Sequence, residues 1–269
     1  MRKNIQIALE LVLLFFKYRR ILSATTLIEF DRRYAGSLFG KIWIFLYPLL
    51  LLSIYLFVYM VIFRMKFPGY SQLSYVLFVF CGLIPYIGFS EAVTSGCLSV
   101  KSNMHLVKNV MFPIELIPVR TVLVSMVTQL VSMGIVMVLS LFEGFPSIHL
   151  VWLPLIFILQ VFFLIGLVWI LSCLAIALPD VSYFVNLFVL FLMFISPIGF
   201  KPDMVPLLLK VVIYFNPIFY MTEMYRSVML YGKFPNMGIA LVYIVMSLGT
   251  FVLGGVFFKR FKGVLVDYE

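Results

Sequence analysis

Charged residues are scarce in this chain. Only 12% of its 269 residues are Asp, Glu, Lys or Arg, whereas a soluble domain carries about a quarter. Hydrophobic residues reach 64%, and the mean hydropathy is +1.15. This shortage of charge excludes an ordinary soluble enzyme or binding domain and indicates an integral membrane protein.

Cysteine and histidine are also rare. Cys81, Cys97 and Cys173 lie inside apolar stretches without paired spacing, which predicts small buried side chains and no disulfide framework. His105 and His149 have no acidic residue or second histidine at a useful spacing. We therefore expect no catalytic residue and no metal site, and we interpret both histidines as exposed loop residues.

A phosphate-binding loop is missing as well. The nearest match, residues 36–42, has one residue too few between its glycines and Ile42 where Ser or Thr must reach magnesium. We expect no cofactor in this chain, so that any use of ATP and magnesium belongs to a partner. The net charge of +9 does not indicate nucleic acid, because the basic residues cluster at the ends of apolar runs.

Long apolar runs dominate the rest of the sequence. A membrane crossing takes about 20 apolar residues, and five uncharged runs reach that length: residues 42–63, 121–142, 150–179, 181–200 and 235–258. A sixth run, 73–100, is interrupted only by Glu91. The run from Leu11 to Phe16 is too short to cross. Basic residues follow it where a signal peptide would be cleaved, so we expect no signal peptide.

The distribution of basic residues predicts the orientation. With six spans, 14 of the 20 Lys and Arg residues fall on the side of both termini, which the positive-inside rule assigns to the cytoplasm. Counting residues 201–234 as a further span would place the C-terminus, with its basic residues, on the other side of the membrane. We therefore predict that this proline-broken segment forms two short helices dipping into the outer leaflet, buried in protein or lining a wet pathway.

A helical pattern precedes the first span. In residues 26–40, Leu27, Phe30, Tyr34 and Leu38 fall on one face, and most polar residues fall roughly opposite, although Asp31 breaks the pattern. Such a helix lies in the membrane interface, where it serves at least as an anchor. The predicted fold is thus an all-α membrane protein: a cytoplasmic N-terminus and interface helix (1–41), a six-span domain (42–258) with a re-entrant segment (201–234), and a cytoplasmic tail (259–269).

Three stretches then resemble the permeases of ABC type-2 exporters. The first carries an R-x-Y-x-x-S-x-L-G-x-x-W pattern before an early proline, and it comprises Arg32, Tyr34, Ser37, Gly40, Trp43 and Pro48, with Phe39 in place of leucine. The second is GLIPYIGFSEAV followed by NMHLVKNVMFPIELIPV, with Tyr86 and Asn109 replacing a tryptophan and a lysine. The third pairs SPIGFKPDMVP with FNPIFYMTEMYRSVML.

Length and the first motif most resemble the polysaccharide exporters: the O-antigen (Wzm-type), capsule and teichoic-acid permeases. This resemblance implies a homodimer bound to two copies of a separate ATP-binding cassette ATPase, exporting a lipid-linked polysaccharide across the inner membrane. It implies an outer gate at Pro197, Asn216, Pro217 and Arg226. It also implies ATPase contacts in the interface helix, the loop 101–113 and the turn 179–182, for which the candidate residues are Asp31, Arg32, Arg33, Tyr34, Ser37, Lys41, His105, Lys108 and Asp180.

Several of these residues keep a second interpretation. Asp180 also suits the N-cap of the fifth span, and Lys101 and Lys108 also serve as orientation charges. Glu91, an acid inside a predicted span, either lines a polar path, pairs with a base such as Arg120, or reaches water at the inner interface.

Aromatic residues suit sugar transport because their faces pack against a pyranose ring. Our candidates for the channel lining are Tyr86, Phe89, Tyr183 and Phe184, together with Glu91. Two rival functions stay open: a stand-alone secondary transporter or channel, which should show inverted repeats and coupling charges, and an integral membrane enzyme, which should show polar clusters in its loops.

Overall fold

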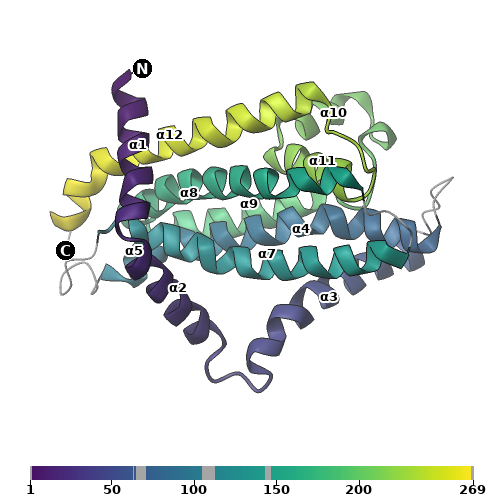
Figure 1. The fold of residues 1–269 in the computed structure, drawn as a ribbon, viewed down its shortest axis with the longest axis horizontal. Helices are drawn as coiled ribbons and strands as arrows, with labels where there is room; N and C mark the ends of the chain where they lie inside the picture. The colour runs from purple at the N-terminus through teal and green to yellow at the C-terminus, as the bar shows by residue number, and fades with distance from the viewer. Residues whose placement is uncertain (1, 63, 65–70, 105–112, 143–146, 268–269) are drawn as a thin grey trace.

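The computed structural model describes residues 2–62, 64, 71–104, 113–142 and 147–267, and in these residues it is built of helices without a β-strand. The main helices are α1 (Arg2–Lys17), α2 (Arg19–Tyr34), α3 (Trp43–Leu56), α4 (Gln72–Cys97), α5 (Ser99–Ser102), α7 (Leu116–Phe142), α8 (Leu153–Ala177), α9 (Val181–Ile195), α10 (Leu207–Phe215), α11 (Pro217–Met229) and α12 (Met237–Asp267). Figure 1 shows α4, α7, α8 and α12 running side by side along the long axis. The predicted all-α membrane fold is confirmed.

Among the described residues, five helical stretches are long and apolar enough to cross a membrane by themselves. They are Gly40–Ile62, Gln72–Cys97, Leu116–Phe142, Ile148–Ala177 and Met237–Lys262. Each agrees with a predicted span to within a few residues, because about 20 apolar residues match the hydrocarbon thickness. We call the end where α4 finishes and α7 begins the α5 end of the bundle, and the other the opposite end.

The predicted span 181–200 differs from the structure. Helix α9 has 15 residues and ends at Ile195, where Ser196 turns to extended backbone before Pro197. Tyr86 in α4 donates to the carbonyl of Val189, and Tyr75 donates to that of Gly199. The segment therefore runs antiparallel to α4. Helix and extended tail together cover about 35 Å, enough to reach the opposite end.

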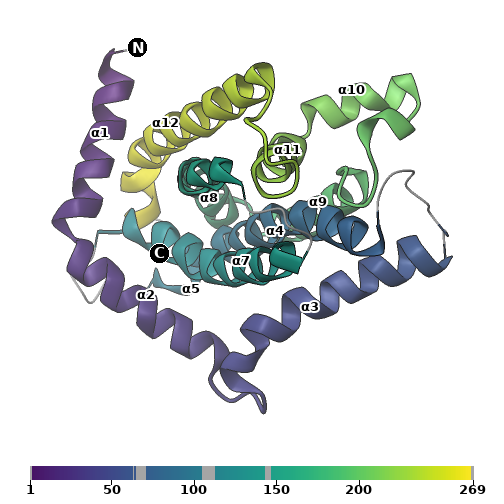
Figure 2. The same cartoon turned by 45° about the vertical axis from the view of Figure 1, so that its right-hand side comes forward.

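Topology makes the α10–α11 segment re-entrant. Helices α8 and α12 run parallel, since Tyr243 donates to the carbonyl of Ile156 and Gly254 contacts Gly166. Because α9 returns to the opposite end and α12 starts there, the chain between them enters and leaves on one side. The axes of α10 and α11 meet at 85° around Asn216. The predicted pair of short helices is confirmed, with α11 in the bundle and α10 outside it (Figure 2).

Small residues let helices α8 and α12 pack backbone against backbone. A Cβ placed on Gly166 of α8 would lie 2.3 Å from the carbonyl oxygen of Thr250, and one on Gly254 of α12 would lie 2.0 Å from that of Gly166. The two backbones therefore touch without intervening side chains. Lipid offers no hydrophobic drive for helix association, so such close backbone contact is a main source of stability in membranes.

A buried polar layer ties four helices together near the centre of the bundle. Gln129 of α7 donates to Gln160 of α8 at 2.7 Å and to the Tyr225 hydroxyl of α11 at 2.8 Å. Gln160 also donates to the carbonyl of Pro85 in α4. A carbonyl oxygen has two lone pairs, so that of Pro85 can accept from Gln160 while it stays within α4.

The N-terminal region departs from the prediction. A helix was expected over 26–40, yet α2 covers Arg19–Tyr34 and ends before Gly36, whose φ of +79° takes the chain out of the helical region. An additional helix, α1, crosses α12, with Phe15 against Trp169 and Phe251. Both termini lie at the α5 end (Figure 1), as the parity of six crossings requires.

The close α8–α12 contact predicts that adding one methyl group at Gly254 lowers the stability of the protein. Replacing Gly254 with Ala should force the two backbones apart and cost about 1–3 kcal/mol. The apparent melting temperature in detergent should fall by about 4 °C or more. Gly249 in the same helix has nothing within 4 Å of an added Cβ, so Gly249→Ala is the matched control and should melt like the parent. Equal melting of the two variants would contradict the close contact.

Candidate functional site

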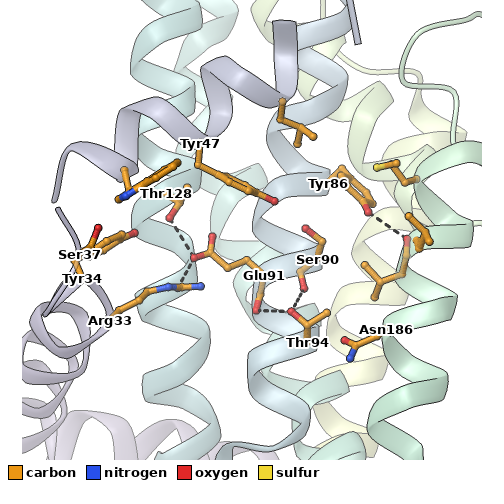
Figure 3. Close-up of a pocket in the computed structure, with 15 residues that line it drawn as sticks. Arg33, Tyr34, Ser37, Tyr47, Tyr86, Ser90, Glu91, Thr94, Thr128 and Asn186 are labelled. Atoms are coloured by element: carbon orange, nitrogen blue, oxygen red, sulfur yellow. Dashed lines mark hydrogen bonds and ion pairs between the residues drawn. The ribbon is translucent and has the colours of Figure 1, made fainter. Parts of the chain in front are cut away.

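A groove of about 600 Å³ opens between α3 and the bundle (Figure 3). It lies where α3 diverges from α4 and α9, and the turn after α2 closes one of its ends. Its polar lining residues are Arg33, Tyr34, Ser37, Tyr47, Tyr86, Ser90, Glu91, Thr94, Thr128 and Asn186, and its apolar ones are Trp43, Leu51, Val189, Leu190 and Met193. Aromatic rings and hydroxyl groups thus share one cavity in an otherwise apolar protein.

Helical spacing places these side chains. Trp43, Tyr47 and Leu51 follow one another at intervals of four along α3, and Tyr86, Ser90 and Thr94 do so along α4. Residues four apart share one face of a helix, so each helix presents one stripe to the groove. This regularity was visible in the sequence, and the polar stripe of α4 was the signal that could have revealed Ser90 and Thr94.

The carboxylate of Glu91 points into the groove and forms an ion pair with Arg33 from the end of α2. Thr128 of α7 donates to the same carboxylate at 3.3 Å. The predicted pair with Arg120 is wrong: Arg120 Nη2 lies 3.3 Å from the carboxylate of Glu29 instead. Sequence spacing could not choose between two arginines, because the choice depends on how α2 packs across α4 and α7.

The predicted channel residues divide into three groups. Tyr86 and Glu91 line the groove. Phe89 does not: it faces the other side of α4, is 2% exposed and stacks on Phe163 of α8, so its assignment to the lining is wrong. Tyr183 and Phe184 project from the outer surface of α9, both more than 70% exposed, and they are absent from the groove's lining.

The predicted ATPase-contact residues fall into two groups: some are exposed, and others face the bundle or the groove. Asp31 and Lys41 form an exposed ion pair of 2.7 Å, and Arg32 is exposed beside them. Arg33 instead turns toward Glu91, and Tyr34 and Ser37 line the groove. This difference arises because the side of α2 that carries Glu29 and Arg33 faces the bundle. His105 and Lys108 lie outside the described residues.

Asp180 stands at the N-cap position of α9, as expected from its sequence position. Its carboxylate accepts no capping hydrogen bond from the helix, so the predicted side-chain cap is wrong. The residue is exposed in the turn between α8 and α9. Of its two interpretations, the exposed polar group at the α5 end is the one this geometry favours.

The four predicted gate residues do gather at the opposite end. Asn216 accepts from the backbone of Ile218 and donates to Ser196, the neighbour of Pro197. Its side chain thereby caps α11, whose first residue is Pro217. Arg226 donates to the carbonyl of Ile198 at 2.5 Å.

Arg226 is fully buried, although it carries a charge. Its guanidinium lies 3.7 Å from the ring centre of Phe78, donates to the Phe78 carbonyl at 3.3 Å, and lies 3.4 Å from the carboxylate of Glu223. A buried guanidinium requires such a complete set of partners. It locks α11 and the extended segment after α9 onto α4.

Removing this guanidinium should loosen the opposite end. Arg226→Leu removes the side-chain donor that the carbonyls of Ile198 and Phe78 share, at a cost of about 2–5 kcal/mol. We expect a lower melting temperature and poor recovery of folded protein after detergent extraction. Lys210→Leu, which removes a cation from the neighbouring α10, should leave both measurements near those of the parent. Comparable losses in the two variants would refute this role of Arg226.

Comparison with known proteins agrees with this architecture. The family model described as ABC-2 type transporter matches residues 22–230. Two proteins of Klebsiella pneumoniae, each named O-antigen export system permease protein RfbA, are 29% identical to this chain over 232 residues, which cover 86% of the chain and 87% of each relative.

A third relative of the same name, from Myxococcus xanthus, is 28% identical over 191 residues, covering 71% of the chain and 72% of its own length. The family match extends from α2 through the groove and the re-entrant helices to the end of α11. It therefore includes every element that builds the two polar sites described above, and the chain belongs to the ABC-2 type transporter family.

Proposed function

We propose that this chain is the transmembrane permease subunit of an ABC transporter that exports a lipid-linked polysaccharide, with ATP hydrolysis in a separate subunit. The observation that carries the proposal is the groove of about 600 Å³, in which aromatic rings and hydroxyl groups line a cavity within a membrane bundle. The names of the relatives, O-antigen export permeases, support the substrate class.

The groove has the chemistry that a sugar requires. Trp43, Tyr47 and Tyr86 offer ring faces for the apolar side of a pyranose. Ser90 and Thr128 offer hydroxyl groups that donate and accept hydrogen bonds. A chain of sugars can exchange such contacts one unit after another, because no single contact is strong enough to hold it.

The ATPase subunit is proposed to dock at the α5 end, with that end in the cytoplasm of the inner membrane. Exposed polar groups there include Asp31, Arg32, Lys41, Lys101 and Asp180. Both termini lie at the same end, and the excess of Lys and Arg at this end agrees with a cytoplasmic location.

A homodimer with two ATPase copies is part of the proposal. The partner permease is proposed to cover the outer faces of α3 and α9, which carry many exposed rings and aliphatic side chains, among them Phe45, Tyr183, Phe184, Phe188 and Phe191. Such a contact would place two grooves on either side of a shared pathway. Tyr183 and Phe184 would then reach that pathway from the dimer interface.

The decisive test separates this proposal from a stand-alone transporter and from a membrane enzyme. We would express the chain with the genes adjacent to its own and isolate it by an affinity tag. An ATPase should copurify, and glycan export in a strain lacking the permease should require the ATPase's catalytic residues. Gradient-driven transport by the chain alone, or a chemical change in the glycan, would instead support one of the rivals.

Filling the groove should block export. Ser90→Trp places an indole in the cavity beside Glu91, so we expect export to fall sharply while the amount of protein in the membrane stays constant. Leu130 of α7 is 48% exposed, away from the groove, and Leu130→Trp adds comparable bulk as the control. Glycan reaching the cell surface, measured by antibody or lectin binding, distinguishes the two. Normal export with Ser90→Trp would rule out the groove as part of the path.

Reversing the exposed charges of α2 should weaken ATPase binding. Asp31→Lys combined with Arg32→Glu alters the surface proposed to face the partner and leaves the groove untouched. The fraction of ATPase copurifying with the permease should decrease severalfold. Lys233→Glu, at the opposite end, is the control and should retain the parental ratio. An unchanged ratio in the α2 variant would place the docking surface elsewhere.

A further inference from the structure

Helix α2 rests on the bundle through charges. Leu22 is the one residue of this helix that is buried. Leu27 and Ile28 are 65% and 67% exposed, on the side away from the bundle. This arrangement is the reverse of a packed amphipathic helix, in which the apolar face would be covered. Outside the turn around Leu22, therefore, little apolar packing holds α2 in place.

Two ion pairs supply the attachment instead. Arg33 pairs with Glu91 of α4, and Glu29 pairs with Arg120 of α7 at 3.3 Å. The side chains of Glu91 and Arg120 are 12% and 5% exposed, whereas those of Arg33 and Glu29 are 30% and 31% exposed. Each pair thus joins a buried charge of the bundle to a partly exposed charge of α2. The buried charge is negative in the pair with Arg33 and positive in the pair with Glu29.

Cavities lie on both sides of these pairs. Beside the groove, a second cavity of about 350 Å³ is lined by Glu29, Arg32, Arg33, Ser95, Ser102, Asn103, Thr121 and Val124. Arg33 lines both cavities, so its side chain is part of the wall between them. One oxygen of Glu91 and the Nε of Arg120 are buried without a hydrogen-bond partner. The contact between α2 and the bundle is therefore polar and incompletely filled.

Both ends of α2 have a joint. At Tyr18 the backbone, with φ −101° and ψ 16°, leaves helical geometry between α1 and α2. Helix α1 itself is fixed, since Phe15 packs on Trp169 and Phe251. At the other end, Gly36 and Gly40 have φ values of +79° and +50°, and an added Cβ would meet nothing within 4 Å of either.

We propose that α2 is a hinged arm and that Glu29 and Arg33 are positioning residues whose ion pairs with Arg120 and Glu91 form a clasp. With the clasp closed, Arg33 separates the two cavities. When it opens, α2 swings away from α4 and α7, and the cavities join into one polar opening at the α5 end. Partly exposed ion pairs are weak enough to break, and the buried charges left behind draw the arm back.

The proposal concerns motion within the chain and does not depend on the transported substrate. It also changes the assignment of Arg33, which acts by holding α2 and needs no contact with an ATPase. The second cavity contains a suitable reporter position, because Thr121 of α7 is 9% exposed and lines it together with residues of α2. The three native cysteines are buried, so the parent chain serves as the labelling blank.

The experiment measures how fast a water-soluble maleimide labels Thr121→Cys in the purified full-length chain. Adding Arg33→Glu should raise the labelling rate about fivefold or more, since the arm then spends more time open. The swap Arg33→Glu with Glu91→Arg should return the rate toward its starting value. Lys41→Glu breaks the exposed pair with Asp31 of the arm, which does not reach the bundle, and should leave the rate unchanged.

Two further measurements separate opening of the arm from general loosening. Ser140 lies at the far end of α7 and is 7% exposed. The labelling rate of Ser140→Cys should not respond to Arg33→Glu. Raising sodium chloride to about 1 M screens partly exposed pairs without any charge substitution. It should therefore speed labelling of the single variant Thr121→Cys, in which Arg33 is unchanged. This second measurement applies even if Arg33→Glu fails to fold. A swap that does not restore the rate, or a rate indifferent to salt, would overturn the proposal.

Discussion

A polar group inside hydrocarbon must find its partner within the protein, and this constraint shapes the bundle. Arg226 shows its strength: a fully buried guanidinium meets the carbonyls of Phe78 and Ile198 and the ring of Phe78. Gln129 and Gln160 satisfy one another and the Tyr225 hydroxyl in the same way. Each of these bonds joins segments far apart in the chain, so the polar groups determine which helices become neighbours.

The same constraint explains why the side of α2 that carries Glu29 and Arg33 faces inward. Glu91 and Arg120 sit inside membrane-crossing helices, and Arg33 and Glu29 are the charges close enough to compensate them. Leu27 and Ile28 of α2 then face outward, where lipid accepts them. The cost is an incompletely packed contact with cavities on either side, and the groove with its sugar-compatible lining is one of them.

Close backbone packing makes another part of the bundle rigid, in contrast to the loosely packed contact of α2. Helices α8 and α12 touch through Gly166 and Gly254, and they fix the end at which the C-terminal helix must start. The excursion through α10 and α11 follows from that start point. The protein thus combines a fixed pair of helices, a locked re-entrant segment at one end, and a loosely held arm at the other.

The sequence by itself determined the membrane class, the positions of the long helices and the re-entrant segment, because hydropathy, length and proline breaks act locally. It also singled out four residues that gather at the opposite end of the bundle and two groove residues, Tyr86 and Glu91. Only the tertiary structure decided which arginine pairs with Glu91, that Phe89 faces the core, and that α2 turns its charges inward. Such choices depend on contacts between helices distant in sequence, and no periodicity within one helix encodes its neighbour.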